Sequence, residues 1–206
     1  MAEPVWPLIH AERRALAADL ADLTQEQWST PSLCAGWTVH QNLAHQVATA
    51  CMTPPKFFGA LIANGFDFQK LTAKDIARYA DGGPASTLER FTAVETSKKA
   101  PPGPTPSWLG EALVHGEDIR RPLGITRDYP AGSVVRVLDF YKGSNLLIGT
   151  KKRIAGVQLK ATDTDWSSGS GALVEGRAID LLLAATGRKA ALDQLTGPGV
   201  DVLRAR

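Results

Sequence analysis

The chain has 206 residues, a hydrophobic fraction of 44%, a charged fraction of 21% and a net charge of +2. These values are ordinary for a globular protein, and they argue against a strongly basic surface for nucleic acid or for an anionic membrane. No apolar run approaches the roughly 20 residues of a membrane span, and residues 1–10 lack the pattern of a signal peptide. Cys34 and Cys51 are too few and too far apart for a disulfide framework, so we expect a reducing cytoplasm.

The first part of the chain has the periodicity of successive helices. Apolar residues recur at threes and fours over residues 8–23, which predicts an amphipathic helix with a charged outer side. Thr24 and Gln27 have the spacing of a capping box for a short second helix. Thr38 and Gln41 repeat this spacing, and they predict the start of a helix that ends before the prolines at positions 54 and 55.

Further helices are expected from there to about residue 148. Aromatic and aliphatic residues suggest a helix over 57–62 that is bounded by Asn64-Gly65, and Ser86 or Thr87 is expected to cap another. The Thr105-Pro106 pair predicts the start of a helix that runs to about Arg121. Residues 133–148 are expected to form one more helix.

The pattern changes after about residue 150. Residues 156–162 alternate with period two, as in a half-buried strand, and residues 172–175 predict a second short strand. Helices over 176–186 and 190–195 and a last strand over 200–203 complete the prediction. We therefore predict an α+β fold, with a helical domain over residues 1–149 and a small α+β domain over residues 150–206.

Glu111 and His115 are the first candidates for a functional site. Their spacing of four places both on one face of the predicted helix, about 40° apart around its axis. Asp118 follows three residues later, beside the apolar Ile119. A Glu–His pair at this spacing also stabilises a helix by roughly 0.2–0.5 kcal/mol without any ligand, so a purely structural role stays open.

A third ligand would have to come from another part of the chain. The other histidines are His10, His40 and His45, and His10 is expected at the surface of the first helix. His40 falls within the apolar stripe of its helix and His45 on the flank of that stripe, so periodicity does not choose between them. Either one could equally be a hydrogen-bonded histidine beside the core.

Several motifs resemble the DinB-like family of mycothiol-dependent maleylpyruvate isomerases. The first is Ser-Leu-Cys-Ala-Gly-Trp-Thr-Val at 32–39, followed by Leu-Ala-His at 43–45. The second is Glu111-x-x-x-His115, followed by Gly-Glu-Asp-Ile-Arg-Arg-Pro-Leu-Gly at 116–124. The segments 161–163 and 174–176, Trp166 and the Gly187-Arg188 pair are similar as well.

The resemblance implies a DinB-like four-helix bundle followed by a small, sterol-carrier-like α+β domain. It implies a divalent metal, most often zinc, held by His45, Glu111 and His115, although two imidazoles and a carboxylate also suit nickel or iron. It also implies an arginine in the second domain that is needed for activity, and Arg188 is the residue that we match to it.

Three protein ligands leave a coordination position open for an outside ligand. A coordinated thiol loses its proton and becomes a nucleophile near neutral pH. We therefore expect a monomeric or homodimeric enzyme that activates mycothiol or a similar thiol for isomerisation of a small electrophile or for thiol transfer to it. Asp118 is expected to orient an imidazole, and Arg188 to bind a carboxylate of substrate or cofactor. The protein's own cysteines are not required.

Two alternatives from other classes are compatible with the same residues. A metal-bound water would give a zinc-dependent hydrolase, which needs no thiol. A structural or vestigial metal would give a non-catalytic metal- and ligand-binding protein. Activity without thiol would favour the first alternative, and folding and ligand retention after chelation would favour the second.

Overall fold

The computed structural model describes residues 4–146 and 148–206, and the chain divides into two compact units, Met1–Thr126 and Arg127–Arg206. The change of sequence pattern predicts this boundary at 149/150. The structure assigns the earlier boundary because α8 (Ala131–Tyr141) packs against α10 (Ala178–Ala185) of the second unit. No helix among the described residues is long and apolar enough to cross a membrane.

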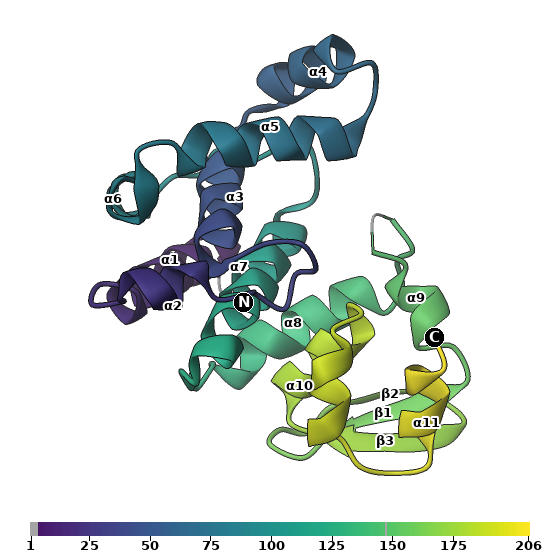
Figure 1. Ribbon diagram of the computed structural model, residues 1–206. Helices are drawn as coiled ribbons and strands as arrows, with labels where there is room; N and C mark the ends of the chain where they lie inside the picture. Colours follow the sequence, from purple (N-terminus) through teal and green to yellow (C-terminus); the bar gives the residue numbers. More distant parts are fainter. Residues whose placement is uncertain (1–3, 147) are drawn as a thin grey trace. The chain divides into compact units, whose positions relative to one another are not determined.

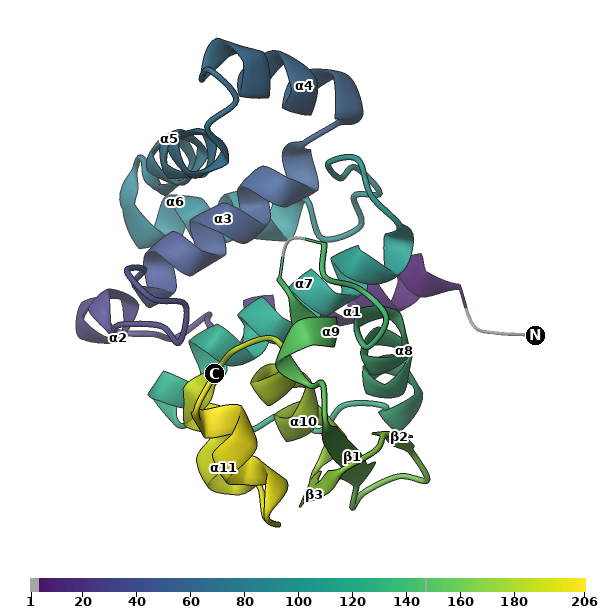
Figure 2. The same cartoon turned by 90° about the vertical axis from the view of Figure 1, so that its right-hand side faces the viewer.

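The first unit is helical (Figure 1). Its elements are α1 (Val5–Asp19), α2 (Gln25–Ser29), α3 (Val39–Cys51), α4 (Pro54–Ala63), α5 (Phe68–Ala80), α6 (Gly83–Ala93), α7 (Thr105–Arg120) and the short turn η1 (Arg121–Leu123). Helix α1 packs against α6 and α7, and α3 packs against the same two helices, so these four form a closed bundle. Helix α5 lies against α3 and α6, and α4 contacts α5 (Figure 2).

The bundle core joins α3 to its neighbours through large apolar side chains. They come from every helix of the bundle and from α2: Leu16, Leu20, Trp28, Val39, Leu43, Val47, Phe91 and Ile119. Both predicted capping boxes are present, with the side chain of Thr24 accepting from the backbone N–H of Gln27 and that of Thr38 from Gln41. The second box fixes the first turn of the helix that carries His45.

The second unit combines helices with a small sheet, which confirms the α+β fold class. Its remaining elements are α9 (Thr150–Arg153), β1 (Val157–Ala161), β2 (Ser167–Gly169), β3 (Ala172–Gly176), η2 (Lys189–Gln194) and α11 (Gly199–Arg204). The strand order is β2-β1-β3; β1 runs antiparallel to β2 and parallel to β3, with Leu159 opposite Val174. Helices α10 and α11 pack against β1 and β3.

Three expected elements differ from the structure. The strand predicted over 200–203 is helix α11, because Val200 and Leu203 are buried at a spacing of three, which one face of a helix provides. The helix predicted over 133–148 begins at Ala131 and already ends at Tyr141. Helix α6 begins at Gly83, after Gly82 in the left-handed region, so neither Ser86 nor Thr87 caps it.

Candidate metal centre

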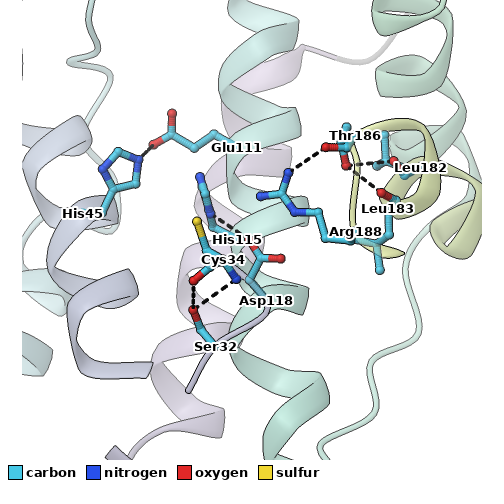
Figure 3. A network of polar contacts seen from close by, with 10 residues as sticks. All are labelled: Ser32, Cys34, His45, Glu111, His115, Asp118, Leu182, Leu183, Thr186 and Arg188. Atoms are coloured by element: carbon cyan, nitrogen blue, oxygen red, sulfur yellow. Dashed lines mark hydrogen bonds and ion pairs between the residues drawn. The ribbon is translucent and has the colours of Figure 1, made fainter. Parts of the chain in front are cut away.

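Helices α3 and α7 bring the three predicted metal ligands together. The imidazole Nε2 of His45 lies 4.0 Å from the carboxylate Oε1 of Glu111, and the ring centroids of His45 and His115 are 5.0 Å apart. In Figure 3 the side chains of His45 and Glu111 point toward each other, with His115 beside them on the helix of Glu111. Side chains separated by about 70 residues of sequence therefore converge at one place inside the first unit.

Burial shifts the pKa values of His45 and Glu111. The pKa of His45 is lowered to about 3, chiefly because burial disfavours the charged ring and also because His115 lies close. Burial likewise raises the pKa of Glu111, while His115, a hydrogen bond from Thr49 and the charge of Arg13 act in the opposite direction. At neutral pH the His45 imidazole is therefore uncharged and has a lone pair available for a cation.

Asp118 lies where it can orient His115. Its Oδ2 is 3.0 Å from Nδ1 of His115, and the carboxylate is fully buried. A carboxylate accepts a hydrogen bond from a ring N–H, so this contact favours the tautomer in which Nδ1 carries the proton and Nε2 is free. Histidines that bind a metal through one ring nitrogen commonly donate the N–H of the other ring nitrogen to a carboxylate in this way.

The loop before α3 closes the other side of the group. The backbone N–H of Leu33 donates to the carbonyl of Asp118 (3.0 Å), which ties this loop to the end of α7. The ring of Trp37 then lies 4.9 Å from the ring of His45 and 6.1 Å from that of His115. Trp37 therefore limits the movement of both imidazoles, a role that the sequence analysis did not assign.

The same loop brings Cys34 to His115. The ligand atoms of Cys34, His115 and Asp118 all lie within 4.8 Å of one another (Figure 3). Among the described residues this is the group of possible ligands that meets this distance, and the predicted set of His45, Glu111 and His115 does not meet it. The hydroxyl of Ser32 holds the turn, because it accepts from the N–H of Cys34 and donates to its carbonyl, both at 3.2 Å. The sequence gives no sign that Cys34 belongs to the site, because its proximity to residue 115 depends on the tie between the loop and α7.

The remaining candidates have other surroundings. His40 Nε2 is 2.9 Å from the hydroxyl of Thr87, so His40 is the hydrogen-bonded histidine beside the core. His10 packs against Trp6, with ring centroids 6.1 Å apart. Arg188, in the second unit, is half-buried and donates to the carbonyl of Thr186 (3.1 Å).

The fold and the site together define a helix-bundle protein with a candidate metal centre. Residues 9–104 match the sequence model of the family described as mycothiol maleylpyruvate isomerase N-terminal domain. This match confirms, for the first unit, the family resemblance that the motifs around His45 indicate. A comparison with curated protein sequences gives no match.

Two solved structures share the fold. One is the crystal structure of a histidine-to-alanine variant of the mycothiol-dependent maleylpyruvate isomerase, with a TM-score of 0.65 and 15% sequence identity. The other, described as the mycothiol-dependent maleylpyruvate isomerase, has a TM-score of 0.57 and 13% identity. Each comparison covers 95% of this chain and 93% of the other, so the likeness of fold extends over both units.

The contact between Asp118 and His115 leads to a first prediction. Replacing Asp118 with Asn removes the anionic acceptor but keeps the size of the side chain. We expect the affinity for zinc to fall about 10- to 100-fold, because partners of this kind orient the imidazole and raise its basicity. Competition with a chromophoric chelator measures this change. Asp180→Asn, at a buried carboxylate of α10 in the second unit, is the matched control, and an equal loss in both variants would contradict the role of Asp118.

Proposed function

We propose that the chain is a metal-dependent enzyme that activates a low-molecular-weight thiol, such as mycothiol, for addition to a small electrophile. The result is isomerisation of a double bond by addition, rotation and elimination, or transfer of the thiol to the substrate. The observation that carries the proposal is the convergence of His45, Glu111 and His115 from two helices. The match to the family of mycothiol maleylpyruvate isomerases supports the choice of thiol.

The residues fit a divalent cation. His45 offers an uncharged imidazole, and Glu111 is a buried carboxyl whose raised pKa reflects the cost of burying its charge. Two nitrogen ligands and one oxygen suit zinc, and three protein ligands leave room for an outside molecule. A zinc ion bound there would supply positive charge that stabilises a thiolate near neutral pH.

The surrounding residues would prepare this site for ligand binding. The contact of Asp118 with Nδ1 of His115 favours the tautomer in which Nε2 of the same ring faces a ligand without a proton. Trp37 packs against both imidazoles and would limit their movement. Thr49 hydrogen-bonds to Glu111 and restrains its carboxylate. These residues are positioning residues for the proposed ligands.

Arg188 has a separate place in the proposal. The resemblance of the C-terminal segment to the same family suggests that a guanidinium binds a carboxylate of the substrate or of the thiol cofactor, with two parallel hydrogen bonds. Arg188 is half-buried, next to the turn that ends α10. Replacement by Lys keeps the charge but removes the planar pair of donors, so it separates these two contributions.

A second arrangement is favoured by the contacts of Cys34. A metal held by Cys34, His115 and Asp118 would have a thiolate from the protein itself, and such a site suits a structural metal. This arrangement has no need of His45 or Glu111. It also uses Asp118 as a direct ligand, which would break its hydrogen bond to His115.

Turnover with and without thiol tests the proposed function. Zinc-loaded protein is mixed with a thiol and a panel of small electrophilic alkenes, and loss of free thiol and isomerisation are followed in parallel. We expect both metal and thiol to be required, with activity lost on chelation and restored by zinc. Hydrolysis of esters or amides without thiol would contradict the proposal and favour a hydrolase.

A further inference from the structure

A cavity of about 40 Å³ lies beside the imidazole of His45, within the first unit. Helices α3 and α5 supply most of its lining, and α4 contributes one residue. The apolar part of the lining comprises Ala48, Met52, Phe57, Phe68, Leu71 and Pro101. Because His45 and Thr49 also line it, the cavity adjoins the candidate metal centre.

The charges around this cavity restrict what it can bind. No lysine or arginine lines it, and its one acidic residue is Asp75. The pKa of Asp75 is raised by burial, against the opposing charge of Arg78, which lies near but does not line the cavity. A carboxylate placed here would lose its water and would find no basic partner in the lining.

Helix α4 forms a weakly held wall of the cavity. None of its residues is buried, and it contacts α5. The ring of Phe57 lies 6.3 Å from the ring of Phe68, which links the two helices. Few buried apolar contacts allow local opening at low free energy, so this wall can move to admit a group larger than the present cavity.

The exposed surface next to this wall is also apolar. Four of the five large hydrophobic side chains that the described residues expose lie here: Phe58, Ile62, Phe66 and Phe68. Phe66 also has a left-handed backbone, with a φ of 63°, which is unfavourable for a side chain of this size. Such exposure is ordinarily costly, and that of Phe68, which also lines the cavity, would decrease if α4 closed over an apolar ligand.

We propose that this cavity is a subsite for a short, uncharged, apolar group of the ligand bound at the metal, and that α4 closes over that group. The proposal rests on the proposed function and adds to it the class of substrate. It assigns to this chain an electrophile with an alkyl or unsubstituted aryl arm next to the reacting carbon. A substrate with a carboxylate in that position would be excluded from the cavity.

Alkyl hydroxamates test the subsite without thiol chemistry, because they bind metals through two oxygen atoms. Dissociation constants are measured with zinc-loaded full-length protein for acetohydroxamate and for the propyl, butyl and pentyl homologues. We expect affinity to rise about fourfold for each added methylene until the cavity is filled. A hydroxamate of similar length that ends in a carboxylate should bind no more tightly than acetohydroxamate.

Neighbouring residues of α4 provide a matched pair of variants. Phe57 lines the cavity, and the adjacent Phe58 is 53% exposed and does not line it. Phe57→Ser should abolish the dependence on chain length, whereas Phe58→Ser should retain it. Phe57→Leu keeps an apolar wall, so it should preserve most of the dependence even if the serine variant folds poorly.

The outcomes separate the subsite from the proposed function. Two results would overturn the subsite alone. One is a hydroxamate affinity that does not change with chain length, and the other is an affinity that is highest for the compound that ends in a carboxylate. An intact chain-length series together with no binding of mycothiol or another thiol would support the subsite and refute the proposed function. Failure of every hydroxamate and every thiol to bind the zinc-loaded protein would refute both.

Discussion

Replacing His45 with Ala is expected to reduce the affinity for zinc by at least about 100-fold. His45 is one of three proposed ligands, and residues that merely orient a ligand already contribute about 10- to 100-fold. Its ring faces Glu111 across 4.0 Å, and no other histidine of α3 is directed there. Zinc content after gel filtration and competition with a chelator both measure the effect.

His40 supplies the control for this experiment, because it is a histidine on the same helix and lies about 1.4 turns away. It is hydrogen-bonded to Thr87 instead, so His40→Ala should retain zinc at the wild-type stoichiometry. Cys34→Ser should retain zinc too, because Cys34 belongs only to the alternative set with His115 and Asp118. Zinc that is lost with Cys34 but retained without His45 would contradict the proposed ligands.

Replacing Phe91 with Ala is expected to lower the free energy of unfolding by about 3–5 kcal/mol. Phe91 is completely buried in the core between α6 and α3. Removal of its ring leaves a cavity in the core against which α3, the helix of His45, packs. Urea denaturation measures the change. Phe58→Ala is the matched control, because this ring is 53% exposed, and its loss should change stability by less than about 1 kcal/mol. Equal effects would show that the assigned core is wrong.

Local signals explain the parts of the fold that could be predicted. Thr24 and Thr38 each have a glutamine three residues later, and this pairing satisfies backbone donors at a helix start wherever it occurs. The strand over 157–161 alternates with period two, so its burial follows from the residue order.

Tertiary context explains the parts that were missed. Residues 200–203 are too few for periodicity to identify the element, and the packing of α11 against β1 and β3 buries Val200 and Leu203 on one helical face. The Ser-Ser-Gly segment of β2 has low strand propensity and is held by pairing with β1.

Some features of the candidate site could likewise be predicted from the sequence, and others could not. The spacing of Glu111 and His115 within one helix was sufficient to place both on one face. The choice of His45 over His40 came only from family resemblance, since both lie near the apolar stripe of α3. The positions of Trp37 and Cys34 beside these histidines depend on the hydrogen bond between Leu33 and Asp118, which no sequence pattern indicates.

X-ray absorption at the zinc edge tests most directly whether two histidines and one glutamate hold an ion that is open to an outside thiol. For the resting protein the account predicts only nitrogen and oxygen ligands, at about 2.0–2.2 Å. Addition of thiol should introduce one sulfur at about 2.3 Å, and it should do so equally in Cys34→Ser. A sulfur ligand already present at rest and absent from Cys34→Ser would contradict the account, as would a zinc site that thiol leaves unchanged.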